Sequence, residues 1–266
     1  MTPVEPRKVS VVVPTIQLDN WLNETVSSIL QNVDVEVELI VVHDGVQPDP
    51  TLQWMQDQRV KVVHFEHRRG LAAGSNAGLL AASNEFVARC DADDISFPNR
   101  LIEQLTFLEK NPKANAVGAC GIRINELGES TGQIAAVTGN DVRKSLCFKN
   151  TMINSSMMFR KSAVLAAGGY DEQMKQMEDY DLLLRMARLG IVANLKSPLI
   201  GYRVHSNQMS RGAKPSGYYI SKVLKERVTL SKALKIKRGT QFLYDFTWRL
   251  AQYLRYLRII RPGYER

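Results

Sequence analysis

Residues 86–94 read Phe-Val-Ala-Arg-Cys-Asp-Ala-Asp-Asp, a short β-prone run that ends in three carboxylates. The side chains of Asp91, Asp93 and Asp94 at the end of one strand repel one another unless a cation lies among them. Such clusters suit Mg²⁺ or Mn²⁺, which hold phosphates through one or two carboxylates and keep several waters. The stretch therefore predicts a metal and nucleoside-diphosphate site at Asp91 and Asp93. The alternative is a loop whose aspartate caps the following helix.

Strands alternate with helices on the N-terminal side of this cluster. The continuous apolar runs of residues 8–15 and 37–42 predict buried strands, and residues 60–65 predict a third. Helical spacing begins after the first run, with Asp19 or Asn20 as the N-cap. This order predicts an α/β fold with a mostly parallel central sheet flanked by helices.

Three predicted strand ends carry polar or turn-forming residues. Pro14 and Thr15 end the first strand, Asp44 follows the second, and the Asp91 to Asp93 cluster follows a later one. Ligands of parallel sheets bind outside the carboxyl ends of the strands, so we expect these residues at one rim. This convergence favours the metal and nucleotide interpretation over the helix-cap alternative.

A helix with a face of small residues is predicted just before the acidic cluster. Glycine recurs every four residues, at Gly70, Gly74 and Gly78. Each glycine inside a helix costs about 1 kcal/mol relative to alanine, so the pattern needs a reason. Two reasons stay open: close packing against another backbone, or approach to a nucleotide with Arg69 near the phosphates.

A second acidic group, at residues 178–181, opens an amphipathic helix. The helix macrodipole favours acids in the first turn, which is one explanation. The other is a general base, because a carboxylate close to a substrate hydroxyl can take its proton and contribute about 10²–10⁴ in rate. His205 lies in a polar loop further on. It is either structural or able to close over a ligand.

Charge is divided unevenly along the 266 residues. Residues 211–266 carry 14 Lys and Arg against 3 acids, whereas the first 210 residues carry 21 and 24. Aromatic and aliphatic residues accompany the basic ones, so we predict a basic, amphipathic helical extension. It can lie on an anionic membrane surface or pack on the catalytic domain with its basic side solvated. Nucleic acid is not an expected partner, because no recognised binding motif accompanies the charge.

Cysteine use and hydropathy bear on the compartment. The three cysteines are scattered, which favours a reducing environment over a disulfide framework. Residues 1–8 lack the apolar core of a secretory signal, and no window of 18 uncharged apolar residues occurs. We expect a cytoplasmic protein, with peripheral contact at the inner face of the cell membrane as an option.

Taken in order, the motifs resemble the inverting glycosyltransferases of family 2, which have the GT-A fold. The resemblance covers residues 9–210, and its motifs are weak singly but specific in their order and spacing. They are residues 11–15 (Val-Val-Val-Pro-Thr), Asp44-Gly45, Gly70-Leu71-Ala72 with Asn76-Ala77-Gly78, residues 91–94, residues 168–172 (Gly-Gly-Tyr-Asp-Glu), residues 178–181, and Tyr202-Arg203 with His205.

The resemblance implies a GT-A catalytic domain over residues 1–210. Residues 1–124 would form its Rossmann-like nucleotide-sugar-binding half and residues 125–210 its acceptor half, followed by the extension of residues 211–266. The implied reaction is that of a hexosyltransferase-like enzyme. It moves a sugar from a nucleotide-diphosphate sugar, usually a uridine one, to a hydroxyl of a glycan or lipid-linked acceptor, with inversion and with Mn²⁺ or Mg²⁺.

The same resemblance implies roles for individual residues. The nucleotide sugar would be bound by Pro14, Thr15, Asp44, Arg69, Asn76, Asp91 and Ala92. The metal would be bound by Asp93, Asp91 and His205. The general base would be Asp179, supported by Glu178 and Asp181. The chain departs from the residues common among relatives at His43, Val46 and Ser75.

Two other classes of protein stay open. A sugar-nucleotide pyrophosphorylase shares the architecture but would carry a glycine-rich loop with Arg and Lys after the first strand. Residues 14–19 of this chain are Pro-Thr-Ile-Gln-Leu-Asp, which argues against it. A nucleotide-sugar-binding protein without catalysis would keep the rim but could lack Asp179, so the presence of Asp179 counts mildly against it.

Overall fold

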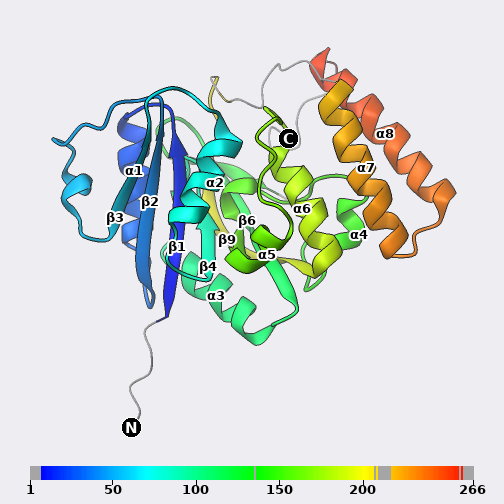
Figure 1. The fold of residues 1–266 in the computed structure, drawn as a ribbon, viewed down its shortest axis with the longest axis horizontal. Coiled ribbons are helices and arrows are strands. Elements are labelled where there is room, and N and C mark those ends of the chain that lie inside the picture. Colours follow the sequence, from blue (N-terminus) through cyan, green and yellow to red (C-terminus); the bar gives the residue numbers. More distant parts are fainter. Residues whose placement is uncertain (1–6, 135, 207, 209–216, 258, 260–266) are drawn as a thin grey trace, which may run out of the picture.

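A nine-stranded sheet runs through the computed structural model, which describes residues 7–134, 136–206, 208, 217–257 and 259 (Figure 1). The strand order is β3-β2-β1-β4-β8-β6-β9-β5, and β7 pairs with β6. The strands are β1 Lys8–Thr15, β2 Glu36–Asp44, β3 Val60–Phe65, β4 Phe86–Arg89, β5 Ile95–Ser96, β6 Ala114–Ile124, β7 Ser130–Ile134, β8 Met158–Arg160 and β9 Ile191–Arg203.

Helices cover both faces of this sheet. The longer ones are α1 Asn20–Leu30, α2 Leu71–Ala81, α3 Arg100–Lys110, α6 Glu178–Leu189, α7 Gly217–Ala233 and α8 Arg238–Tyr256. The shorter ones are α4 Arg143–Leu146, α5 Lys161–Ala166 and the 3-10 turns η1 Gln53–Gln56 and η2 Asn154–Ser156.

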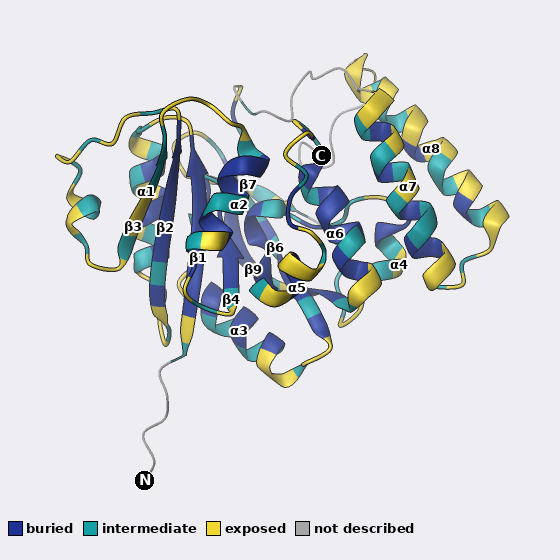
Figure 2. Ribbon diagram, in the orientation of Figure 1, coloured by how far each residue is buried: buried dark blue, intermediate teal, exposed yellow. Residues whose placement is uncertain are grey.

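The first half of the sheet is parallel, as the sequence predicts. Strands β1, β2, β3 and β4 pair in parallel. Alternate residues of β1 enter different cores: Val11 packs in the cluster that contains Leu22 of α1, whereas Val12 packs with Leu79 of α2. Burial on both faces explains the continuous apolar run (Figure 2). Asp19 caps α1 by accepting the N–H of Leu22 at 2.9 Å.

The glycine face of α2 lies against the sheet. A Cβ added at Gly78 would lie 2.2 Å from Cγ1 of Val12, and one at Gly74 would lie 3.4 Å from Cβ of Pro14. Any side chain at position 78 would therefore push α2 away from β1. Of the two reasons left open for the glycine pattern, close packing is the one that this contact supports.

The second half of the sheet mixes parallel and antiparallel pairs, and two of its strands, β5 and β9, were not predicted from the sequence. β8 is antiparallel to both β4 and β6, and β6 is parallel to β9. Lys196, Ser197 and Pro198 interrupt the apolar pattern of β9, where its register with β6 shifts. Since β9 ends at Arg203, it brings the chain to the same region as the end of β4.

The predicted C-terminal extension is helical and packs on the rest of the protein through α7. Ile220, Val223 and Leu230 of α7 are buried, and Trp248 of α8 is only 6% exposed. The predicted domain boundary at residue 210 and residues 211–216, 258 and 260–266 of the extension lie outside the described residues. Within the part of the chain that is described, no helix is both long and apolar enough to cross a membrane.

Candidate active site

The ends of β1 and β2 form one side of the rim. The Thr15 hydroxyl donates to the Gln17 carbonyl at 2.6 Å, which fixes the turn after Pro14. Asp44 is 3% exposed and accepts the N–H of Arg69 at 2.6 Å and the N–H of Gly70 at 2.9 Å. Both oxygens of Asp44 thus hold the segment that leads into α2. Its predicted contact with the nucleoside stays a prediction.

Arg69 and Asn76 connect the two halves of the protein. The Asn76 amide donates to the Tyr170 carbonyl at 2.9 Å and accepts the Tyr170 N–H at 2.9 Å. Asn76 also donates to Glu172 at 3.0 Å, while the Arg69 guanidinium lies 3.3 Å from the same carboxylate. These contacts secure the loop that precedes α6. A nucleotide-binding role for either side chain stays a prediction.

The strand-end carboxylates have positively charged or polar partners. Asp91 lies 2.6 Å from Arg89, its N–H donates to the Ser155 hydroxyl at 2.8 Å, and its side chain is 30% exposed. Oδ2 of Asp93 lies 2.8 Å from Nε2 of His205. Burial and the charge of Asp91 raise the pKa of Asp93, and His205 opposes that rise. Ala92, half-buried between the two acids, completes the loop.

The third carboxylate of the cluster is structural. Asp94 is 1% exposed and accepts the N–H of Arg203 at 2.8 Å. Burial, together with the charges of Asp93 and Asp91, raises the pKa of Asp94. Asp94 therefore ties β9 to the end of β4, and only Asp91 and Asp93 are left to face a ligand.

Arg203 holds the histidine side of the rim, and the sequence analysis assigned it no role. Its fully buried guanidinium donates to the carbonyls of Asp93 and Glu126, each at 2.8 Å, and it lies 2.5 Å from Glu24. The guanidinium also lies 5.5 Å from the ring of Trp21, whose centroid is 4.6 Å from that of His205. An arginine at a strand end two residues before the histidine was the available signal.

The second acidic group lies at the start of α6. Glu178 is 6% exposed, and its burial beside Asp179 raises its pKa to about 7. Asp179 is half-buried and accepts the Asn150 amide at 3.2 Å, and burial raises its pKa. Met177, directly before them, has a φ of 61°. Such strain in a non-glycine residue often accompanies functional sites.

Arg89 links the two acidic groups. Its guanidinium is almost fully buried, and the charges of Asp91 and Glu178, with the nearby Tyr170, raise its pKa. The charge of Asp91 in turn raises the pKa of both Glu178 and Asp179. The end of β4 and the start of α6 therefore share one electrostatic environment, although 88 residues separate Asp91 from Asp179. The signal for Arg89 was a cation inside an apolar strand, which requires a partner.

Asp181 points away from this environment. Its carboxylate is 4% exposed and lies 2.6 Å from the Arg185 guanidinium, one helical turn further along. Both residues line a polar cavity of about 460 Å³ that is also bordered by Asp171 and Lys222. The structure thus brings Glu178 and Asp179 together with the rim but places Asp181 in the packing between α6 and α7.

Asp91 and Asp93 suit a metal that is held partly by its substrate. Within the described residues, no three Asp, Glu, His or Cys side chains gather closely enough to enclose an ion. Arg89 and His205 each engage one carboxylate oxygen, and both acids are partly exposed. Mg²⁺ and Mn²⁺ sites that complete their coordination with phosphates and water need only one or two carboxylates. The donor set fits that mode rather than a closed protein cage.

Comparison with known proteins identifies the family. The family model described as Glycosyl transferase family 2 matches residues 10–167, and the chain belongs to this family. It is therefore a glycosyltransferase, which confirms the class of enzyme predicted from the motifs.

Two curated relatives and a solved structure are similar over most of the chain. The amylovoran biosynthesis glycosyltransferase AmsE of Erwinia amylovora is 30% identical over 83% of this chain and 85% of its own. The O-antigen biosynthesis glycosyltransferase WbnJ of Escherichia coli is 29% identical over 82% and 90%. Residues 1–349 of S. aureus TarS, solved with UDP-GlcNAc, superpose with a TM-score of 0.70 at 16% identity, over 93% of this chain and 72% of that one. The shared architecture confirms the predicted GT-A fold.

Proposed function

We propose that this glycosyltransferase inverts the anomeric centre of a sugar that it moves from a nucleoside diphosphate to an acceptor hydroxyl, with Asp179 as the general base. The observation that carries the proposal is the shared electrostatic environment of Asp91 and Asp179 around the buried Arg89. One group of acids can then face the leaving diphosphate while the other faces the attacking alcohol.

The proposed reaction is a single displacement in which Asp179 accepts the proton of the acceptor hydroxyl. The acceptor oxygen forms a bond to the anomeric carbon as the bond from that carbon to the diphosphate oxygen breaks. Asp179 takes the hydroxyl proton, and its raised pKa makes it a stronger base than an exposed aspartate. One displacement from the opposite face inverts the configuration. Arg89 stabilises the negative charge that the carboxylates retain around the site.

Asp93 and Asp91, with His205 beside them, would hold Mn²⁺ or Mg²⁺. When bound, such an ion offsets the charge that develops on the departing diphosphate. His205 and Arg203 both contact Asp93 of the Asp-x-Asp motif, His205 at the carboxylate and Arg203 at the backbone carbonyl. This pairing keeps the Asp93 side chain oriented toward the rim.

The relatives support one class of donor and one class of acceptor. Structures of TarS contain UDP and UDP-GlcNAc, which supports a uridine-diphosphate sugar bound along Pro14, Thr15 and Asp44. The printed names of AmsE and WbnJ refer to amylovoran and O-antigen biosynthesis, so we infer a glycan or lipid-linked acceptor in polysaccharide assembly. We further infer a GT-A catalytic domain over residues 1–210 in a cytoplasmic enzyme whose extension, residues 211–266, contacts the inner membrane surface.

The test is a panel of nucleotide sugars incubated with the full chain in Mn²⁺, Mg²⁺ or EDTA. We expect metal-dependent, slow hydrolysis of one donor, and NMR of the first product formed should show the inverted anomer. A product of retained configuration would refute the inverting mechanism. Formation of a nucleotide sugar from a sugar phosphate and a nucleoside triphosphate would instead favour the pyrophosphorylase.

A binding protein without catalysis predicts a different result. It would bind one donor by calorimetry yet release no sugar above the rate of a control lacking protein. The Asp179→Asn variant is the internal comparison, because it should reproduce that behaviour. A wild-type protein that behaves like this variant would refute the transferase mechanism.

A further inference from the structure

The two faces of α8 differ sharply. The inward face carries Trp248, which is 6% exposed and whose ring centroid lies 6.2 Å from that of Tyr180. It also carries Gln241, which donates to the Cys147 carbonyl at 3.2 Å. The outward face is apolar. Its large exposed side chains recur at intervals of three or four residues, and they are Phe242, Phe246, Leu250, Tyr253 and Leu257. This periodicity forms one continuous stripe on the side opposite Trp248.

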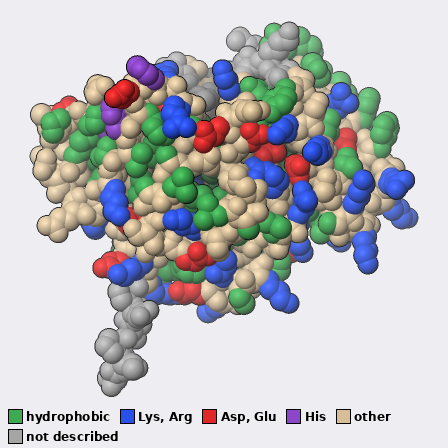
Figure 3. Space-filling model, viewed as in Figure 1, with side chains coloured by type: hydrophobic (Ala, Val, Ile, Leu, Met, Phe, Trp, Pro, Cys, Tyr) green, Lys and Arg blue, Asp and Glu red, His purple; other side chains and the backbone are tan. Residues whose placement is uncertain are grey.

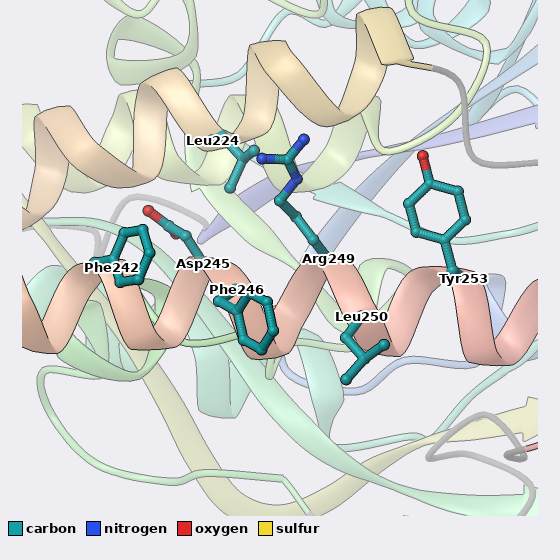
Figure 4. A pocket seen from close by; sticks show the side chains of 7 residues that line it. All are labelled: Leu224, Phe242, Asp245, Phe246, Arg249, Leu250 and Tyr253. Atoms are coloured by element: carbon teal, nitrogen blue, oxygen red, sulfur yellow. The ribbon is translucent and has the colours of Figure 1, made fainter.

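The stripe borders a groove against α7. A cavity of about 460 Å³ opens between the two helices, and Leu224, Phe242, Asp245, Phe246, Arg249, Leu250 and Tyr253 line it (Figure 4). Phe242 is 73% exposed, and no described part of the chain covers it. Soluble proteins rarely expose a contiguous row of aromatic and aliphatic side chains unless a partner binds there.

The charge around the stripe is strongly positive. Residues 217–256 hold nine Lys and Arg against two acids, and both acids are engaged: Glu226 lies 2.8 Å from Arg188, and Asp245 lies 2.9 Å from Arg227. Lys232 and Arg238 are exposed and, among the described residues, form no ion pair. On the face that Figure 3 shows, Lys and Arg side chains are scattered over the right of the molecule, where α7 and α8 lie.

We propose that α8 lies flat in the interface of an anionic lipid bilayer, with its apolar stripe among the acyl chains. Lys232, Arg238 and Arg249 would contact the headgroups. An amphipathic helix with a basic border binds in this way without crossing the membrane. A second copy of the chain is the less suitable partner, because a symmetric contact would bring the same positive charges together. An anionic surface supplies the opposite charge.

The placement of α7 connects this surface to the catalytic site. α7 packs on α6, and Lys222 of α7 lies 2.6 Å from Asp171 in the loop before α6. Asp179 lies in the first turn of α6. A bilayer bound to α8 would therefore hold the base at a fixed distance from lipid-linked acceptors. The inference rests on the proposed membrane contact of the transferase and is independent of its metal and its donor.

The experiment is flotation of the full chain with vesicles of phosphatidylcholine alone or mixed with phosphatidylglycerol. We expect the wild type to float with the anionic vesicles and to be released by high salt. The double variant Phe246→Ser with Leu250→Ser should lose about tenfold or more in partitioning, because two apolar side chains leave the interface. The double variant Lys232→Glu with Arg238→Glu should bind anionic vesicles more weakly than the wild type. Its partitioning into vesicles of phosphatidylcholine alone should equal that of the wild type.

Matched controls separate the surface from general effects. Leu127→Ser removes a side chain that is 82% exposed in the turn between β6 and β7, and it should float like the wild type. Hydrolysis of the nucleotide sugar without vesicles should be unchanged in every variant, which keeps this result distinct from failure of the proposed function. Equal flotation of Phe246→Ser/Leu250→Ser and the wild type overturns the proposal. The proposal is also overturned if the wild type does not bind vesicles, or if it forms a dimer that Phe246→Ser/Leu250→Ser dissociates.

Discussion

The two acidic groups of the site both consist of carboxylates, but their partners differ. At the end of β4, Asp91 lies 2.6 Å from Arg89 and Asp93 lies 2.8 Å from His205. At the start of α6, Asp179 accepts only the neutral amide of Asn150 among its described side-chain contacts, at 3.2 Å. A carboxylate in an ion pair favours its charged form, whereas a carboxylate that is buried without an ion-pair partner binds protons more tightly.

This difference indicates that the two acidic groups have different roles in catalysis. The β4 group suits the retention of negative charge, because Arg89 and His205 lie against its carboxylates and His205 opposes the rise that burial and Asp91 cause in the pKa of Asp93. The α6 group suits the transfer of a proton, because the pKa of Glu178 rises to about 7 and the pKa of Asp179 also rises. Replacement of each carboxylate should therefore change a different property of the enzyme, and the following substitutions test that separation.

Asp179→Asn should have the largest effect on turnover. The amide keeps the shape of the side chain but cannot take a proton, so we expect kcat to fall by about 10²–10⁴. The Kd for the nucleotide, measured by calorimetry, should stay close to the wild-type value. A variant with wild-type turnover would remove Asp179 from the base role. The matched control is Asp181→Asn, two residues further along the same helix.

Asp93→Ala should abolish the metal dependence of nucleotide binding. Without this carboxylate, the affinity for UDP in Mn²⁺ should fall to the affinity measured in EDTA, because the phosphates would no longer share a cation with the protein. Titration calorimetry with and without Mn²⁺ measures both values. Asp141→Ala, which removes an exposed carboxylate paired with Arg143, is the control. If Asp93→Ala binds UDP as the wild type does in both buffers, Asp93 is not a ligand.

Much of the rim could be predicted from the sequence because its pattern is local. Strand runs at residues 8–15, 37–42 and 60–65 each contain enough apolar residues to be recognised alone, and the polar residues follow them directly. The structure then joins His205 to Asp93 across 112 residues. The sequence analysis placed His205 near Asp93 only through the resemblance to a family, because no local pattern links the two residues.

The parts that could not be predicted depend on long-range contacts. β9 carries Lys196 and Pro198 in its middle, and its pairing with β6 and β5 makes it a strand. β5 has two residues, too few for any periodicity. Arg89 and Arg203 read as ordinary basic residues in the sequence. Their roles depend on burial, because a buried guanidinium must form ion pairs or hydrogen bonds with nearby carboxylates or carbonyls.

Glu178→Gln should separate proton affinity from catalysis. The pKa of Glu178 is raised from 4.5 to about 7, so the folded protein binds a proton that the unfolded chain releases. Its contribution to stability is complete below pH 4.5 and is lost as the pH rises to about 7, a change on the order of 3 kcal/mol. The variant should flatten that decline in thermal unfolding measured across this range. Turnover should stay within about tenfold of wild type, since Asp179 remains.

A loss of turnover in Glu178→Gln equal to that of Asp179→Asn would contradict this division. The two acids would then act as one coupled pair that shares a proton, and neither could be named as the base. An unchanged pH profile of unfolding would instead show that Glu178 has the same pKa in the folded and unfolded states.

Asp181→Asn should have the smallest effect on activity, because its carboxylate faces Arg185 rather than the rim. Replacement leaves the Arg185 guanidinium without its charged partner in a nearly buried position, although Arg185 still donates to the Ala167 carbonyl. We expect the free energy of unfolding to fall by about 2 kcal/mol in chemical denaturation, with kcat unchanged. A variant that folds as stably as the wild type but turns over slowly would place Asp181 in the catalytic group. The contrast between the β4 and α6 acids would then extend to Asp181, two residues further along α6 than the contacts indicate.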